Sequence, residues 1–78
     1  MKDNTTNTKT TAKRTRVWYC VTATFPNSGI VRASITATTT ATTKPRSTFK
    51  STNWADIYCD WYGTRTAAER AVSDALAA

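Results

Sequence analysis

The 78-residue chain has no histidine and only two glycines, two prolines and two cysteines. Without histidine the commonest general base is missing, and two cysteines alone make a poor metal site. Two glycines cannot form a glycine-rich loop that cradles phosphates. Asp56 and Asp60 lie four residues apart in a predicted strand, about 13 Å, which exceeds the spacing of paired catalytic carboxylates. The sequence therefore predicts no enzyme, no metal site and no cofactor.

Long apolar runs are also missing. No segment approaches the roughly 18 apolar residues that a membrane-spanning helix requires, so we expect no membrane partner. Residues 1–16 are polar and lack the hydrophobic stretch of a secretory signal peptide. We expect a cytoplasmic protein, located in the host cytoplasm if a phage encodes it, whose two cysteines are free thiols.

Negative charge is scarce and unevenly distributed. The formal net charge is +6. Residues 13–50 contain seven basic residues and no acidic one, whereas residues 51–78 contain four acidic residues and two basic ones. A basic middle followed by an acidic end suggests that one side of the molecule meets an anionic partner. The alternative is a mildly basic, solvated surface without such a partner.

The chain divides into a tail and one domain. Residues 1–13 have no hydrophobic periodicity, which predicts a disordered basic tail before a single domain at residues 14–78. Three segments rich in β-branched and aromatic residues predict antiparallel strands, at residues 17–24, 30–38 and 54–62. A turn at residues 25–29 joins the first two strands. Residues 39–53, interrupted by Pro45, predict a long basic loop.

The C-terminal segment predicts a helix that follows Gly63 and runs to the end of the chain. Thr64 or Thr66 is the expected N-cap, and Thr66 with Glu69 matches a capping box. The helix carries one apolar stripe, formed by Ala68, Ala71, Val72, Ala75 and Leu76. The predicted fold is therefore α+β, a three-stranded antiparallel sheet with one C-terminal helix packed on one face.

Alternation along the strands predicts which side chains face this helix. The apolar sets expected beneath Val72 and Leu76 are Val17, Tyr19, Val21 and Ala23, then Val31, Ala33, Ile35 and Ala37, then Ile57, Cys59 and Trp61. The opposite, open face would present Arg14, Arg16, Trp18, Cys20, Thr22, Thr24, Arg32, Ser34, Thr36, Tyr58 and Tyr62. Such a mixture suits phosphates and stacked bases, although strands favour threonine and tyrosine in any case.

The same alternation has two further consequences. Cys20 and Cys59 should lie on opposite faces of the sheet, where they cannot form a disulfide. Asp56 and Asp60 should lie on the open face, where their charge would oppose DNA.

The segment from Trp61 to Ala71 (WYGTRTAAERA) resembles part of a known module. It is similar to the last strand and helix of DNA-binding domains with a three-stranded sheet, namely the plant ethylene-response-factor domain and the arm-type domain of tyrosine integrases. In this resemblance Thr64 matches the helix-capping threonine, and Ala68, Ala71 and Ala75 match small residues that pack on the sheet. The resemblance implies that the open face enters the DNA major groove, with Arg16, Trp18 and Arg32 on it.

Two functions are consistent with these features. The first is a small basic nucleic-acid-binding protein, encoded by a phage or mobile element, with double-stranded DNA as the expected partner. Its candidate binding residues are Lys13, Arg14, Arg16, Trp18, Arg32, Lys44, Arg46, Lys50 and Tyr58. The alternative is a phage-encoded inhibitor that binds a host protein, an enzyme or a defence complex, because exposed aromatic side chains favour protein interfaces.

Overall fold

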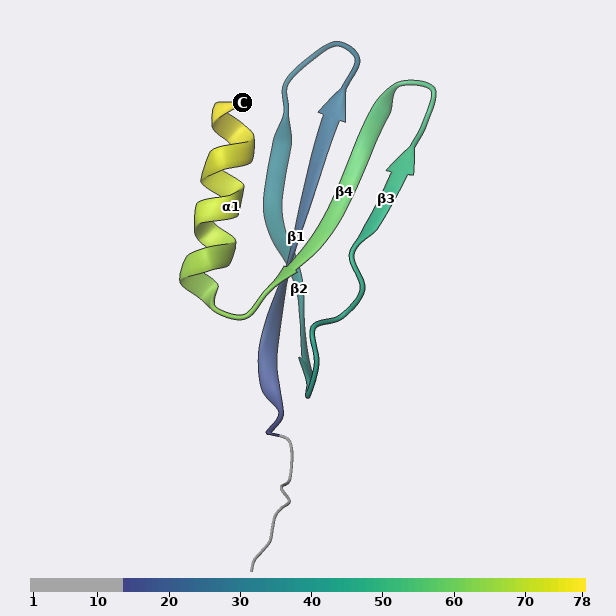
Figure 1. Cartoon of the computed structure of the whole chain (residues 1–78). Helices are drawn as coiled ribbons and strands as arrows, with labels where there is room; N and C mark the ends of the chain where they lie inside the picture. The colour runs from purple at the N-terminus through teal and green to yellow at the C-terminus, as the bar shows by residue number, and fades with distance from the viewer. Residues whose placement is uncertain (1–13) are drawn as a thin grey trace, which may run out of the picture.

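Four antiparallel strands and one helix form the described part of the chain, residues 14–78, in this computed structural model (Figure 1). In chain order they are β1 (Arg16–Pro26), β2 (Arg32–Ala41), β3 (Thr48–Ser51), β4 (Ala55–Tyr62) and α1 (Arg65–Ala77). The order within the sheet is β2-β1-β4-β3. The predicted α+β fold with a C-terminal helix is confirmed, and the sheet has four strands instead of three. The predicted tail, residues 1–13, lies outside the described residues.

The unexpected strand is β3, which lies in the predicted loop and pairs with β4. Its four residues are too few to show a periodic pattern, and all four are exposed. The turn that follows is closed by Thr52, whose backbone N–H donates to the Ala55 carbonyl at 2.8 Å. The Thr52 hydroxyl oxygen also accepts from the Ala55 N–H at 3.0 Å. Polar capping of this kind lets a short strand form without apolar alternation.

A β-bulge interrupts the pairing of β1 with β2. Cys20 is opposite Ala37, but the next residue, Val21, is opposite Ile35, so Thr36 is an extra residue in β2. A bulge shifts the alternation of side chains by one position. Ala37 therefore shares a face with Cys20 and not with Ile35, and its predicted place in the apolar set beneath the helix is wrong.

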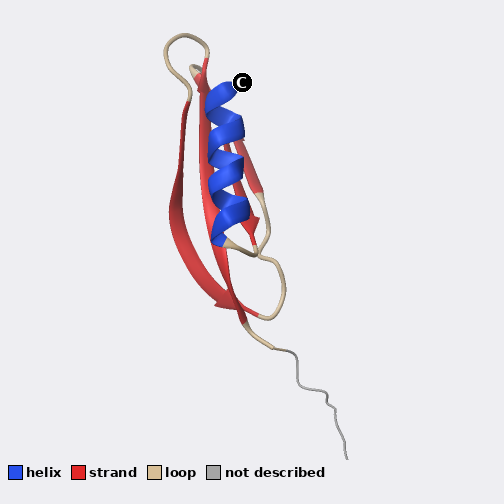
Figure 2. Ribbon diagram, turned by 90° about the vertical axis from the view of Figure 1, so that its left-hand side faces the viewer, coloured by secondary structure: helices blue, strands red, loops and turns tan. Residues whose placement is uncertain are grey.

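Helix α1 begins at the N-cap Thr64, whose hydroxyl oxygen accepts from the Ala67 N–H at 3.1 Å. Of the two predicted caps, Thr64 is the one observed. The predicted capping box of Thr66 with Glu69 does not form, because Thr66 lies inside the helix, and the Glu69 carboxylate pairs with the Arg65 guanidinium at 3.1 Å. Figure 2 shows the helix lying along one face of the sheet, and it packs mainly on β2 and β1.

The core consists of small side chains. The buried residues among those described are Cys20, Val21, Ala23, Ala55 and Ala68. Ala68 has no exposed surface and anchors the helix on the sheet. Leu76, which the apolar stripe predicted to pack on the sheet, is instead 52% exposed. No helix in residues 14–78 is long and apolar enough to cross a membrane.

Candidate nucleic-acid interface

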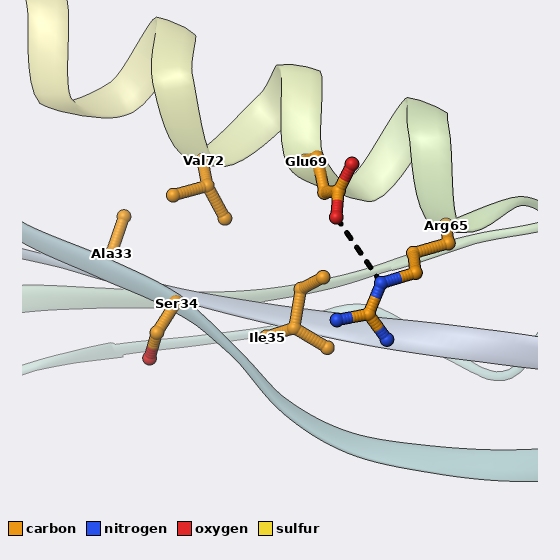
Figure 3. Close-up of a pocket in the computed structure, with 6 residues that line it drawn as sticks. All are labelled: Ala33, Ser34, Ile35, Arg65, Glu69 and Val72. Carbon is orange, nitrogen blue, oxygen red and sulfur yellow. Dashed lines mark hydrogen bonds and ion pairs between the residues drawn. The ribbon is translucent and has the colours of Figure 1, made fainter.

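The strand register assigns each side chain to one face of the sheet, because residues directly opposite each other point to the same side. Figure 3 shows Ala33 and Ile35 on the side of the sheet that faces α1, whereas Ser34 points away from the helix. Val21 pairs with Ile35 and also with Asp60, so all three lie on the side of the helix. The other face, which we call the open face, is the one that α1 does not cover.

Three cross-strand rows of paired residues define the centre of the open face. The outermost row is Arg32, Thr24, Ile57 and Lys50; the next is Ser34, Thr22, Cys59 and Thr48; the third is Ala37, Cys20 and Trp61. Trp18 and Arg16 follow along β1 in the same alternation, opposite Thr39 and Ala41. Cations thus stand at both edges of the first row and at the far end of the face, with hydroxyl groups and tryptophans between them.

Arg16 and Trp18 form a packed pair at one end of this face. The Arg16 guanidinium carbon lies 5.1 Å from the centroid of the Trp18 ring, within cation–π range. The indole N–H of Trp18 donates to the Ala41 carbonyl at 3.2 Å, which fixes the ring against β2. A Cβ atom at Gly63 would lie 3.0 Å from the Arg16 Nη2 atom, so the missing side chain of Gly63 makes room for the guanidinium.

A row of hydroxyl and thiol groups crosses the middle of the open face. The Thr22 hydroxyl lies 2.8 Å from the Thr36 hydroxyl and 3.4 Å from the Cys59 sulfur. The hydrogen bond from Thr22 lowers the pKa of the Cys59 thiol, although burial acts in the opposite direction and Thr48 and Cys20 contribute smaller lowering effects. The hydroxyl groups of this row offer polar contacts that carry no formal charge.

The predicted placement of Asp56 and Asp60 on the open face is wrong. Asp56 pairs with Phe25 and Asp60 with Val21, which puts both carboxylates on the side of the helix. The Asp60 carboxylate accepts a hydrogen bond from Ser47 and forms an ion pair with Lys44 at 3.6 Å. Hydrogen bonding by Ser47 is the main reason that the pKa of Asp60 is lowered, with further contributions from the Trp61 N–H and Lys44.

Tyr58 and Tyr62 are also on the other face from the one predicted. Tyr58 pairs with Ala23 and Tyr62 with Tyr19, so both lie on the helix side. There Tyr58 packs against Phe25 and Phe49, with ring centroids 5.6 and 4.8 Å apart. Burial, together with the nearby charge of Asp60, raises the pKa of Tyr62.

The structure gathers four of the nine predicted binding residues on the open face: Arg16, Trp18, Arg32 and Lys50. Tyr58 is on the opposite face, and Lys44 is engaged by Asp60. Arg14 and Arg46 are exposed outside the strands, and Lys13 lies outside the described residues.

Residues of β4 that alternation assigned to the helix side belong to the open face instead. Trp61 pairs with Cys20, Cys59 with Thr22, and Ile57 with Thr24. Cys20 and Cys59 are therefore on the same face, and the predicted reason for their remaining unbridged is wrong; both are free thiols. Alternation gave the two sets of β4 correctly but not which set faced the helix, because only the pairing with β1 decides that.

The chain matches no protein-family model, no curated protein and no solved structure, so the resemblance to three-stranded DNA-binding domains stays a prediction.

Proposed function

We propose that this chain binds nucleic acid through its open face. The observation that carries the proposal is the separation of charge between the two sides of the sheet. Arg16, Arg32 and Lys50 are on the open face, and the acidic residues of the described chain are elsewhere: Asp56 and Asp60 on the helix side, Glu69 and Asp74 on α1. A face with cations and no carboxylate favours a polyanion, since no like charge opposes the phosphates.

The neutral groups of the open face fit the same ligand. The hydroxyls of Thr22, Thr36 and Ser34 can donate to phosphate oxygens, as side-chain hydroxyls commonly do in nucleic-acid complexes. Phosphate contacts of this kind position the ligand without reading its sequence, and they make binding depend on salt. We therefore expect a binder with little base preference.

The test is fluorescence anisotropy of a labelled oligonucleotide across a salt titration. Arg16→Ala, Arg32→Ala and Lys50→Ala should each weaken binding, and Arg32→Ala and Lys50→Ala should each reduce the slope of log affinity against log salt by about 0.7 to 0.9. Arg70→Ala is the matched control, because Arg70 is an exposed cation on the helix side. Absence of binding at low salt, or equal losses for Arg70→Ala and the other three, would overturn the proposal.

A protein partner is a second candidate function, supported by aromatic side chains away from the open face. Phe49 is 57% exposed and Trp54 is 66% exposed, although both are large and apolar. Exposed aromatic side chains are typical hot spots of protein interfaces. If a host protein co-purifies with the chain in stoichiometric amount after nuclease treatment of the lysate, the double variant Phe49→Ala, Trp54→Ala should no longer recover it. Arg32→Ala should recover as much of that protein as the wild type does.

A further inference from the structure

We infer that the nucleic acid bound by the open face is single-stranded, with bases stacked at the Arg16–Trp18 pair and on Trp61. The inference rests on the proposed function and names its ligand class. Two features support it: the width of the sheet, and the prebuilt stacking surface at one end of the face.

The width of the sheet argues against insertion into a duplex. Arg32 on β2 and Lys50 on β3 belong to one row that crosses all four strands. Three spacings between neighbouring strands separate them, about 14 Å before side chains are added. The major groove of B-DNA is about 12 Å wide and admits a helix or a two-stranded ribbon. Where β3 completes the sheet, the fourth strand therefore removes the fit to a groove that the sequence resemblance implied, whereas at Trp18 the sheet consists of β1 and β2 alone.

A duplex would contact the four-stranded part of the sheet only through its phosphates. Trp18 and Trp61 would find no free base face to stack on, because the bases of a duplex stack on one another. A single strand exposes its bases, and aromatic rings on a four-stranded sheet commonly stack them.

The stacking surface is held in place before any ligand arrives. Hydrogen bonding to Ala41 fixes the Trp18 indole, and the guanidinium of Arg16 lies against that ring above Gly63. Bases stack on guanidinium planes as well as on aromatic rings. Trp61 follows in the next row of the open face and is only partly buried.

The cations lie where the backbone of such a strand would continue. Thr24, whose row holds Arg32 and Lys50, lies six positions beyond Trp18 along β1. This corresponds to about 20 Å of strand. The hydroxyls of Thr22 and Thr36 lie between the two ends. Stacking at one end and phosphate binding at the other suit a short site, at the lower end of the range of about 4 to 16 nucleotides known for such surfaces.

The experiment compares three labelled ligands at one ionic strength: a 20-nucleotide oligo-dT, a 20-nucleotide oligo-U and a 20-base-pair duplex. We expect both single strands to bind at least about tenfold more tightly than the duplex. The comparison of oligo-dT with oligo-U shows whether the chain prefers DNA or RNA. If the duplex binds as tightly as oligo-dT, the inference fails while the proposed function stands. If none of the three binds, both fail.

Variants then test the stacking itself. Trp18→Ala should weaken oligo-dT binding about 5- to 150-fold, the range measured for one stacked base. Trp61→Phe should retain most of the affinity that Trp61→Ala loses, because phenylalanine also stacks. Trp54→Ala is the control, since Trp54 is in the turn between β3 and β4 and outside the proposed contact. Equal losses for the duplex would contradict stacking.

A second measurement does not require an alanine variant to fold. The chain has three tryptophans, so Trp54→Phe leaves Trp18 and Trp61 as the only indole emitters. Oligo-dT should quench their fluorescence by stacking, and the duplex should not. Unchanged fluorescence at saturating oligo-dT would overturn the inference even if binding is tight.

Discussion

At the scale of single residues, Gly63 acts through the space that it leaves for Arg16. We expect Gly63→Ala to weaken oligonucleotide binding modestly, because its Cβ would lie 3.0 Å from the Arg16 Nη2 atom and shift the guanidinium that packs against Trp18. Anisotropy measures the loss. If Gly63 acts through Arg16, the double variant with Arg16→Ala should bind no worse than Arg16→Ala alone. Additive losses would mean that Gly63 has a separate role.

The carboxylate of Asp60 makes the stability of the fold depend on pH. Because hydrogen bonds from Ser47 and Trp61 lower its pKa in the folded state, the charged form stabilises the fold above the unfolded value of about 4. That contribution is lost as the pH falls through the unfolded value toward the folded one. Asp60→Asn should therefore lower the Tm at pH 7, and the difference from wild type should shrink toward pH 2. A constant difference across this range would contradict the linkage.

The reactivity of the Cys59 thiol tests whether this side chain of β4 lies on the open face. Its thiol pKa is lowered by Thr22, and its side chain is more exposed than that of Cys20, which is buried. Alkylation at pH 8 should therefore modify Cys59 before Cys20, because the thiolate is the reacting species. Thr22→Val should slow the reaction, and bound oligo-dT should protect Cys59. Modification unaffected by a saturating oligonucleotide would place the ligand elsewhere.

At the scale of elements, sequence rules treat Thr64 and Thr66 as equivalent N-caps of α1, but only Thr64 is the cap in the structure. Thr64→Ala should reduce the free energy of unfolding by about 1 kcal/mol, because the Ala67 N–H loses its acceptor. Thr66→Ala is the matched control and should cost less than half as much, since Thr66 lies within the helix and makes no cap. Urea unfolding of both variants measures the difference. Equal costs would contradict the assigned cap.

Local sequence predicted the long strands of the sheet but not its short strand or its bulge. Residues 17–24 and 54–62 were predicted as strands from their β-branched and aromatic content, and both lie largely within β1 and β4. β3 was missed because its four residues are held by the Thr52 turn and by pairing with β4. The bulge at Thr36 was missed because an extra residue shows only when a partner strand is present.

At the scale of the whole molecule, binding and stability should be coupled. Only small side chains are buried in the core of residues 14–78, so the free energy of unfolding is small and a bound ligand changes it measurably. Oligo-dT at 100 times its Kd should add about 2.7 kcal/mol of stability, a rise in Tm of about 10 to 20 °C for a domain of this size. Raising the salt should reduce the rise. An unchanged Tm at saturating ligand would show binding that does not depend on the fold.

The sequence by itself determined the α+β class, the C-terminal helix and the scarcity of acids before residue 51, because these depend on local propensity and composition. The alternation within each strand was also readable, so Arg16, Trp18 and Arg32 were correctly grouped. Only the tertiary structure decided which side of β4 faces the helix, since pairing with β1 fixes it and either choice has the same period of two. As a result Asp56 and Asp60 lie on the helix side, away from the cations of the open face, and Trp61 and Cys59 lie on the open face with those cations.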